Sequence, residues 1–168
     1  MEKTETPAST YKTEYAAILE KFDNHDLIQV FTDGSKSECD TGFSVIKQTN
    51  STTTPIETSL LAPHASVFTS EAEALLFACK CANKSKKKAL IFTDSLSSLT
   101  SVKNINCNTE GIRQIRDIFI GNKNIHLIWI LSNIGINGNE VADLEAKLVN
   151  KKPLIFRAST NTKDIKNK

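Results

Sequence analysis

Two short, largely apolar segments that lie far apart in the chain end in the same way. Leu27–Thr32 leads into Asp33, and Ala89–Thr93 leads into Asp94, so that Phe-Thr-Asp closes both. Apolar, β-branched runs of this kind are typical of strands inside a sheet that is covered on both sides. Ligands of such α/β sheets collect at the carboxyl ends of the strands. If the two strands are neighbours, Asp33 and Asp94 face each other at one edge of the sheet.

The rest of the chain supplies the other elements of an α/β fold. A turn at Asp33-Gly34-Ser35 is predicted to end the first strand. The further elements expected, in chain order, are strands over Thr41–Gln48 and within Thr52–Leu61, a helix from an N-cap at Ser70 to about Asn83, helices over Ser95–Val102 and Thr109–Ile120, a strand over Asn124–Leu131 and a helix over about Asn139–Asn150. Hairpin-like strands followed by alternating helix and strand indicate a mixed sheet with helices on its faces.

The composition limits the class of protein. The 168 residues, 39% hydrophobic and 24% charged, are enough for one globular domain with tails. The net charge of +2 is too small to imply nucleic-acid binding by itself. No stretch approaches the roughly 20 apolar residues of a membrane span, and the first residues lack the apolar core of a secretory signal. We therefore expect an intracellular protein of the nucleus or cytoplasm, neither secreted nor bound to a membrane.

Two further acidic residues complete a candidate site. Glu71 lies near the start of one predicted helix, and Asp143 lies one turn into the last. Each acid has an ordinary explanation: Asp33 and Asp94 as turn residues, Glu71 as a partner of the helix dipole, Asp143 as a solvated helix residue. If all four converged, their repulsion would call for hard divalent cations such as Mg²⁺. Two such ions about 4 Å apart activate water and stabilise the leaving oxygen in phosphodiester hydrolysis.

Four blocks of sequence carry a resemblance to a known family. They are Thr32–Ser35, Ser66–Glu71, Phe92–Ser95 and Trp129–Asp143, the last with the sequence WILSNIGINGNEVAD. In order and approximate spacing they resemble type 1 ribonuclease H, in detail the RNase H domains of non-LTR retrotransposon reverse transcriptases. The resemblance implies a ribonuclease H-like fold, a five-stranded mixed β-sheet flanked by helices.

The domain organisation follows from the extent of these blocks. We expect an RNase H type 1 domain over residues 26–152. Residues 1–25 are interpreted as a polar N-terminal tail, or the docked remnant of an upstream segment, with a candidate short helix near Tyr11–Phe22. Residues 153–168 are interpreted as a polar C-terminal tail.

The resemblance also implies roles for individual residues. The catalytic residues, which are also the ligands of two Mg²⁺ ions (with Mn²⁺ as a substitute), would be Asp33, Glu71, Asp94 and Asp143. Asp33 would bridge both ions, and Glu71 is preferred to Glu73 because it directly follows the Ser66–Ser70 block. Gly34 and Ser35 match positions where the family brings its backbone close to the RNA strand and contacts the 2′-hydroxyls, which distinguish RNA from DNA.

One position departs from the family pattern. Where the family usually has histidine in the loop after the last strand, this chain has Asn133, which we assign to substrate binding. Asparagine hydrogen-bonds but does not titrate near neutral pH. We predict slower turnover rather than none, since losing a positioned proton-transfer group typically costs about 10²-fold or more.

Several alternatives stay open at this point. The main expectation is an endonuclease that hydrolyses the RNA strand of RNA–DNA hybrids, with a reverse transcriptase domain in a longer polyprotein as a partner. The alternatives are a catalytically weak hybrid-binding accessory domain of a retroelement and an integrase-like nuclease. The lysine run Lys84–Lys88 has an ordinary explanation as a solvated loop between helix and strand, which we favour. The alternative is phosphate contact, either from this run or from a face formed by Lys103, Arg113 and Arg116. Trp129 is expected in the core.

Overall fold

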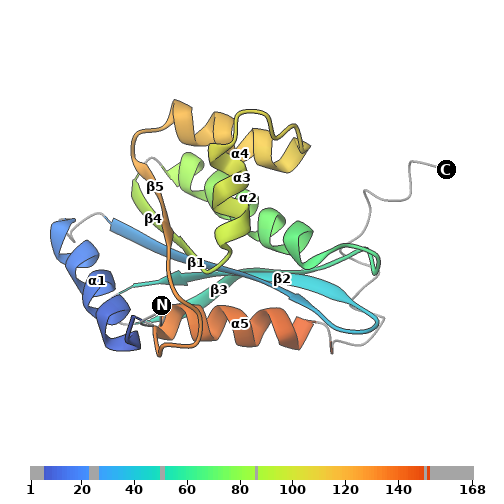
Figure 1. The fold of residues 1–168 in the computed structure, drawn as a ribbon, viewed down its shortest axis with the longest axis horizontal. Helices are drawn as coiled ribbons and strands as arrows, with labels where there is room; N and C mark the ends of the chain where they lie inside the picture. The colour runs from blue at the N-terminus through green and yellow to red at the C-terminus, as the bar shows by residue number, and fades with distance from the viewer. Residues whose placement is uncertain (1–5, 23–26, 50–51, 86, 150, 152–168) are drawn as a thin grey trace, which may run out of the picture.

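A five-stranded mixed sheet forms the centre of the protein (Figure 1). The computed structural model describes residues 6–22, 27–49, 52–85, 87–149 and 151. The strands are β1 (Leu27–Lys36), β2 (Thr41–Gln48), β3 (Thr53–Leu61), β4 (Lys88–Thr93) and β5 (Ile125–Trp129). Their order across the sheet is β3-β2-β1-β4-β5, with β1 antiparallel to β2 and parallel to β4. The expected mixed sheet of five strands is thus confirmed.

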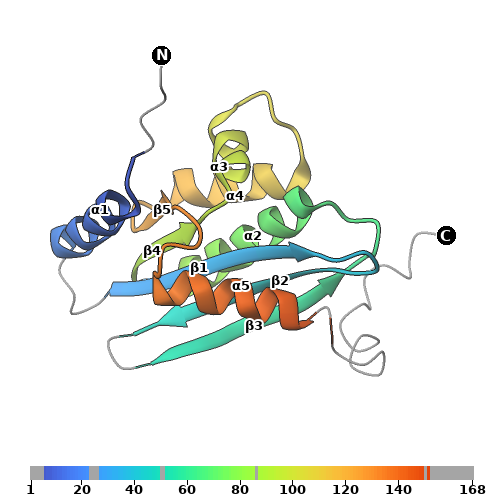
Figure 2. The same ribbon diagram turned by 60° about the horizontal axis from the view of Figure 1, so that its bottom comes forward.

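Helices cover both faces of this sheet. They are α1 (Ala8–Lys21), α2 (Val67–Ser85), α3 (Leu96–Lys103), α4 (Glu110–Gly121) and α5 (Asn137–Val149). Helices α2, α3 and α4 lie on one face, and α5 crosses β1, β2 and β3 on the other (Figures 1 and 2). No helix in the described part of the chain is long and apolar enough to cross a membrane.

Alternation of side chains along the strands divides the core between the two faces. Val30 and Ile91 point toward α2 and its neighbours, whereas Phe31 and Phe92 point toward α5. The Phe31 and Phe92 rings stack with their centroids 4.9 Å apart, and neither ring is exposed. Both faces of β1 and β4 are therefore buried, which explains why these strands lack a polar face.

Two boundaries near the candidate site differ from the prediction. β1 does not end in a turn at Asp33-Gly34-Ser35, because β2 continues to pair with it as far as Lys36. The N-cap assigned to Ser70 is also wrong: α2 begins at Val67, and the Ser66 hydroxyl accepts from the Thr69 amide at 3.0 Å. Ser70 is instead buried, and its hydroxyl donates to the Val67 carbonyl.

The candidate helix near Tyr11–Phe22 is confirmed as α1. It covers the part of the sheet that α5 leaves open, because its apolar side chains pack against the cluster that contains Phe31, Leu90 and Phe92. The proposed C-terminal tail, residues 153–168, lies outside the described residues. The domain boundaries therefore stay a prediction.

Candidate active site

The sheet brings two of the candidate carboxylates together. β1 and β4 are parallel neighbours in a register that pairs Thr32 with Thr93, the residues directly before Asp33 and Asp94. Asp33, which lies inside β1, and Asp94, which directly follows β4, are therefore neighbours at the same level of the sheet. A carboxylate oxygen from Asp33, one from Asp94 and one from Glu71 all lie within 4.8 Å of one another.

Glu71 joins this group because α2 lies very close to β1. A Cβ added to Gly34 would lie 2.6 Å from the amide nitrogen of Glu71, so only glycine allows the approach. Glu71 and Asp33 are both buried, at 7% and 6% exposure. The three carboxylates thus come from separate elements and converge, with Asp33 and Glu71 buried and Asp94 half-buried.

Crowding and burial disturb the ionisation of these groups. Burial, followed by the charges of Asp94 and Asp143, raises the pKa of Asp33 to about 8. Burial and the charge of Asp33 raise the pKa of Glu71 to about 9. Burial also raises the pKa of Asp94, although a hydrogen bond from Asn139 opposes this. In the absence of a cation, the site holds protons near neutral pH.

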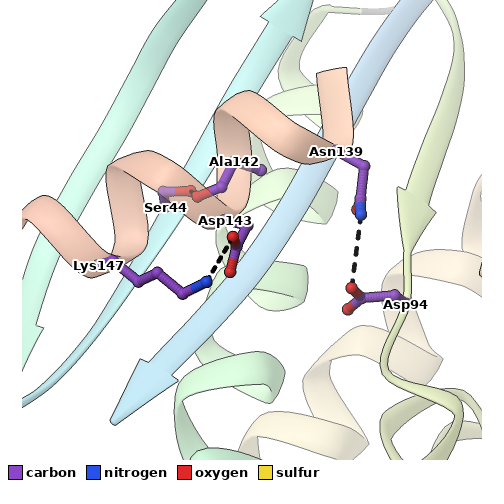
Figure 3. Close-up of polar contacts among 6 residues, drawn as sticks. All are labelled: Ser44, Asp94, Asn139, Ala142, Asp143 and Lys147. Carbon is purple, nitrogen blue, oxygen red and sulfur yellow. Dashed lines mark hydrogen bonds and ion pairs between the residues drawn. The ribbon is translucent and has the colours of Figure 1, made fainter. Parts of the chain in front are cut away.

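Asp143 is placed differently from the other three acids. It lies on α5, outside the group within 4.8 Å, and its Oδ2 accepts from the Lys147 ammonium at 2.6 Å. Figure 3 shows the two side chains facing each other along the helix. Asp143 is still close enough to raise the pKa of Asp33, Glu71 and Asp94 through its charge.

Two contacts fix α5 over the sheet. The Ser44 hydroxyl donates to the Ala142 carbonyl at 2.6 Å (Figure 3). At the start of the helix, Gly138 lies against the Phe31 ring with no room for a side chain. These contacts set the position of Asp143 relative to β1.

Two site residues were missed at the level of sequence. Asn139 is buried, and its Nδ2 lies 3.5 Å from Asp94 Oδ2 (Figure 3). It therefore links α5 to the trio, the three acids Asp33, Glu71 and Asp94. It belongs to the Gly138–Asp143 part of the family block, and that membership was the available signal. Lys147 was also missed, although a lysine four residues after an aspartate commonly pairs with it on a helix.

The three predicted substrate-binding residues lie on two different parts of the chain, β1 and the loop before α5. Gly34 and Ser35 follow Asp33 on β1 and are partly accessible. Asn133 is exposed in the loop between β5 and α5, with a left-handed φ of 56°. Asparagine and histidine are among the few side chains that adopt this conformation readily. The backbone at Asn133 therefore accommodates the histidine that the family usually has there.

The donor set fits a hard divalent cation. Glu71 Oε2 is buried and has no hydrogen-bond partner among the described residues. A buried carboxylate oxygen without a partner is costly unless a proton or a cation satisfies it. Carboxylate oxygens in this number and spacing are what Mg²⁺ or Mn²⁺ binds, and no cysteine or histidine among the described residues belongs to the group.

The candidate basic faces differ in availability. The Arg116 guanidinium donates to carbonyls at the end of α3, including Val102 at 3.0 Å and Asn104 at 2.6 Å. Arg113 pairs with Glu110 on the surface of α4. Lys88 lies over the Phe22 ring, and Lys86 is outside the described residues. Arg116 is thus engaged in the structure of α3, which weakens the case for the Lys103, Arg113 and Arg116 face.

Comparison with known proteins places the fold. No model of a protein family matches the chain, and no curated protein matches it. A foamy viral protease-reverse transcriptase in complex with dsDNA is 22% identical with a TM-score of 0.61, over 73% of this chain and 92% of that chain. The same foamy viral protein in complex with RNA/DNA hybrid is 21% identical with a TM-score of 0.61, over 73% of this chain and 20% of that chain.

A cellular enzyme gives a similar result. RNase H1 from Halobacterium salinarum NRC-1 is 15% identical with a TM-score of 0.57, over 74% of this chain and 98% of that chain. At these identities the likeness establishes the fold. The expected ribonuclease H-like fold is thus confirmed.

Proposed function

We propose that this protein is a metal-dependent endonuclease of the type 1 ribonuclease H class that hydrolyses the RNA strand of RNA–DNA hybrids. The observation that carries the proposal is the convergence of Asp33, Glu71 and Asp94, whose oxygens lie within 4.8 Å of one another. A protein that only bound nucleic acid would have no use for buried acids that repel one another, and anionic phosphates would be repelled as well.

The residues would act mainly by holding cations and excluding water. The charge of Asp33 raises the pKa of Glu71, and the charges of Asp94 and Asp143 raise the pKa of Asp33. Asp33 would therefore be a shared ligand of the Mg²⁺ ions. Glu71, Asp94 and Asp143 would complete the ligand set. Two bound ions supply an activated water and stabilise the leaving oxygen. Asn139 would keep the Asp94 carboxylate oriented toward the ions.

The choice of substrate rests on fold likeness together with the β1 edge. A foamy viral protein of similar fold binds RNA/DNA hybrid, and a similar archaeal protein is an RNase H1. Gly34 and Ser35 lie next to Asp33 and are partly accessible, as contact with a 2′-hydroxyl requires. The likeness to a protease-reverse transcriptase also supports a reverse transcriptase domain as a partner, within a retroelement polyprotein.

A second candidate function is a catalytically weak hybrid-binding domain. Asn133 favours it, because the loop lacks a group that titrates near neutral pH. The ion pair of Asp143 with Lys147 also favours it, since the fourth acid already has a cationic partner. The intact set of Asp33, Glu71 and Asp94, two of them buried, favours hydrolysis.

One experiment separates these functions. The protein is incubated with labelled RNA–DNA hybrid, RNA duplex or DNA duplex, in Mg²⁺, in Mn²⁺ and in chelator. Cutting of the hybrid alone that needs metal and disappears in Asp94→Asn supports the nuclease. Binding of the hybrid without cutting in either metal supports the accessory domain, and cutting of DNA duplex supports an integrase-like enzyme.

A further inference from the structure

A single tryptophan connects the N-terminal helix to the candidate site. The Trp129 indole Nε1–H donates to the main-chain carbonyl of Asp94 at 3.1 Å, and the ring of Tyr11 packs edge-on against the same indole at 5.9 Å. We propose that Trp129 is a positioning residue for Asp94 and that α1, through Tyr11, holds the indole in place. This inference rests on the proposed function, because it concerns the metal affinity of the site.

Asp94 needs such support because it lies beyond the end of the strand ladder. β4 ends at Thr93, whose carbonyl still accepts from the Ile130 amide at 3.0 Å. The next carbonyl, that of Asp94, accepts from the Leu96 amide at 3.0 Å at the start of α3. The Trp129 indole thus adds a second donor, from β5, to a carbonyl that otherwise accepts only from the start of α3 among the hydrogen bonds of the described residues.

Trp129 in turn lies at an open edge. β5 is the terminal strand in the order β3-β2-β1-β4-β5, and Trp129 is its last residue. The indole is only partly buried against the core under α2 and α4. Beyond β5, Tyr11 of α1 supplies an aromatic partner, an arrangement worth more than its buried area alone.

The contacts of α1 show that it is a docked element with a defined orientation. At its middle, Tyr15 packs on Phe92 at 5.2 Å, and its hydroxyl donates to Gln29 at 3.1 Å. At its end, Phe22 packs on His126 at 4.8 Å. The helix therefore runs against the direction of β5, from Trp129 at the site to His126 at the far end (Figure 1). Only its first turns reach the site.

The direction of α1 along β5 provides a matched pair of variants in the full chain. Tyr11→Ala and Phe22→Ala each remove one aromatic ring from an end of α1, but only Tyr11 contacts Trp129. Tyr11→Phe keeps the ring edge and serves as the conservative rescue. Trp129→Phe keeps a ring and removes the Nε1–H donor to Asp94. Each variant is titrated with Mn²⁺ by calorimetry, and its urea unfolding is measured alongside.

We expect Trp129→Phe to weaken Mn²⁺ binding about 10-fold, the lower end of the range for groups that orient metal ligands. Tyr11→Ala should weaken it about threefold, the order of one aromatic pair, and Tyr11→Phe should match the wild type. Phe22→Ala should leave Mn²⁺ affinity unchanged even where it lowers stability as much as Tyr11→Ala. Because Trp129 is the sole tryptophan, its fluorescence should also respond to Mn²⁺ in every variant that keeps it.

Two results overturn the proposal. One is wild-type Mn²⁺ affinity in both Trp129→Phe and Tyr11→Ala, and the other is equal loss in Tyr11→Ala and Phe22→Ala. If Trp129→Phe does not fold, the Tyr11 and Phe22 variants decide alone. If the wild-type protein neither binds Mn²⁺ nor cuts hybrid, the proposed function is refuted and this proposal with it. If the wild type does both and the variants bind Mn²⁺ as it does, only the positioning role is refuted.

Discussion

The two sides of the candidate site are built by different means. On the sheet side, Asp33 lies inside β1, Asp94 directly follows β4, and the close approach of α2 at Gly34 brings Glu71 to them. On the α5 side, Asp143 is a third exposed and shares its charge with Lys147, and Asn133 sits in an exposed loop. The carboxylates of the sheet side are thus mostly buried and lack a close cationic partner among the described residues, whereas Asp143 on the α5 side is accessible and paired with Lys147. We infer that the sheet side sets whether the site binds metal, and that the α5 side tunes it.

The largest expected effect is the loss of a sheet-side acid. Asp33→Asn should lower hydrolysis of RNA–DNA hybrid by about 10³-fold or more, because a metal contributes several kcal/mol of charge stabilisation in the transition state. Asp143→Asn, on the α5 side, should cost only about 10- to 100-fold. Single-turnover rates at saturating Mg²⁺ test the difference. Equal losses in the two variants would remove the distinction between the two sides.

The second effect concerns the loop on the α5 side. Asn133→His should raise the rate of hydrolysis by up to about 10²-fold, because a positioned histidine can transfer a proton near neutral pH. The left-handed backbone at Asn133 accepts this side chain, so stability should change little. The gain should appear in kcat and should fade at acidic pH, where histidine is protonated. An unchanged rate would show that proton transfer in this loop does not limit turnover.

The third effect is a dependence of stability on pH in the metal-free protein. The pKa of Asp33 is about 8 and that of Glu71 about 9 in the folded state, against ordinary values near 4. Between about pH 4 and 9 the folded state therefore binds more protons than the unfolded chain. The free energy of unfolding must fall as pH rises through this window, by on the order of a few kcal/mol.

Urea unfolding in chelator at a series of pH values measures this fall. Mg²⁺ added at about pH 8 should restore the lost stability, because it binds the folded state alone. Asp33→Asn should flatten the profile strongly, and Asp143→Asn should flatten it less, because Asp143 keeps its own cation in Lys147. A profile that is already flat in the wild type would mean that the trio is not strained by repulsion.

The division of the site into a sheet side and an α5 side also explains which parts of it the sequence predicts. Asp33 and Asp94 could be paired because two apolar runs lead into Phe-Thr-Asp in the same way, although in the structure only β4 ends there. The family resemblance implied that Glu71 lies close to Asp33 and Asp94. Local sequence could not establish it, because it depends on the contact at Gly34 between segments far apart in the chain. No local pattern indicated that β2 prolongs β1 to Lys36, because cross-strand pairing decides it.

The α5 side and α1 were harder to predict for a related reason. The pairing of Asp143 with Lys147 competes with its convergence on the trio, and a sequence pattern cannot weigh a local contact against a distant one. The docking of α1 depends on which part of the sheet α5 leaves uncovered, a property of the whole fold. From this mostly polar segment the sequence analysis predicted a short helix, but not the place where the helix packs.

The smallest expected effect tests the tuning role of Lys147 directly. Lys147→Met removes a positive charge next to Asp143, frees that carboxylate and lessens repulsion of incoming cations. Because the lysine side chain is 59% exposed, its ion pair is weak, and Mg²⁺ affinity should tighten only about two- to threefold. Lys80→Met, at an exposed position of α2, is the matched control and should leave the affinity unchanged. The gain should shrink at high salt, where exposed charges are screened. A weaker affinity in Lys147→Met would instead show that Lys147 holds Asp143 in its binding position, so that the fourth acid depends on its counter-ion to serve the site.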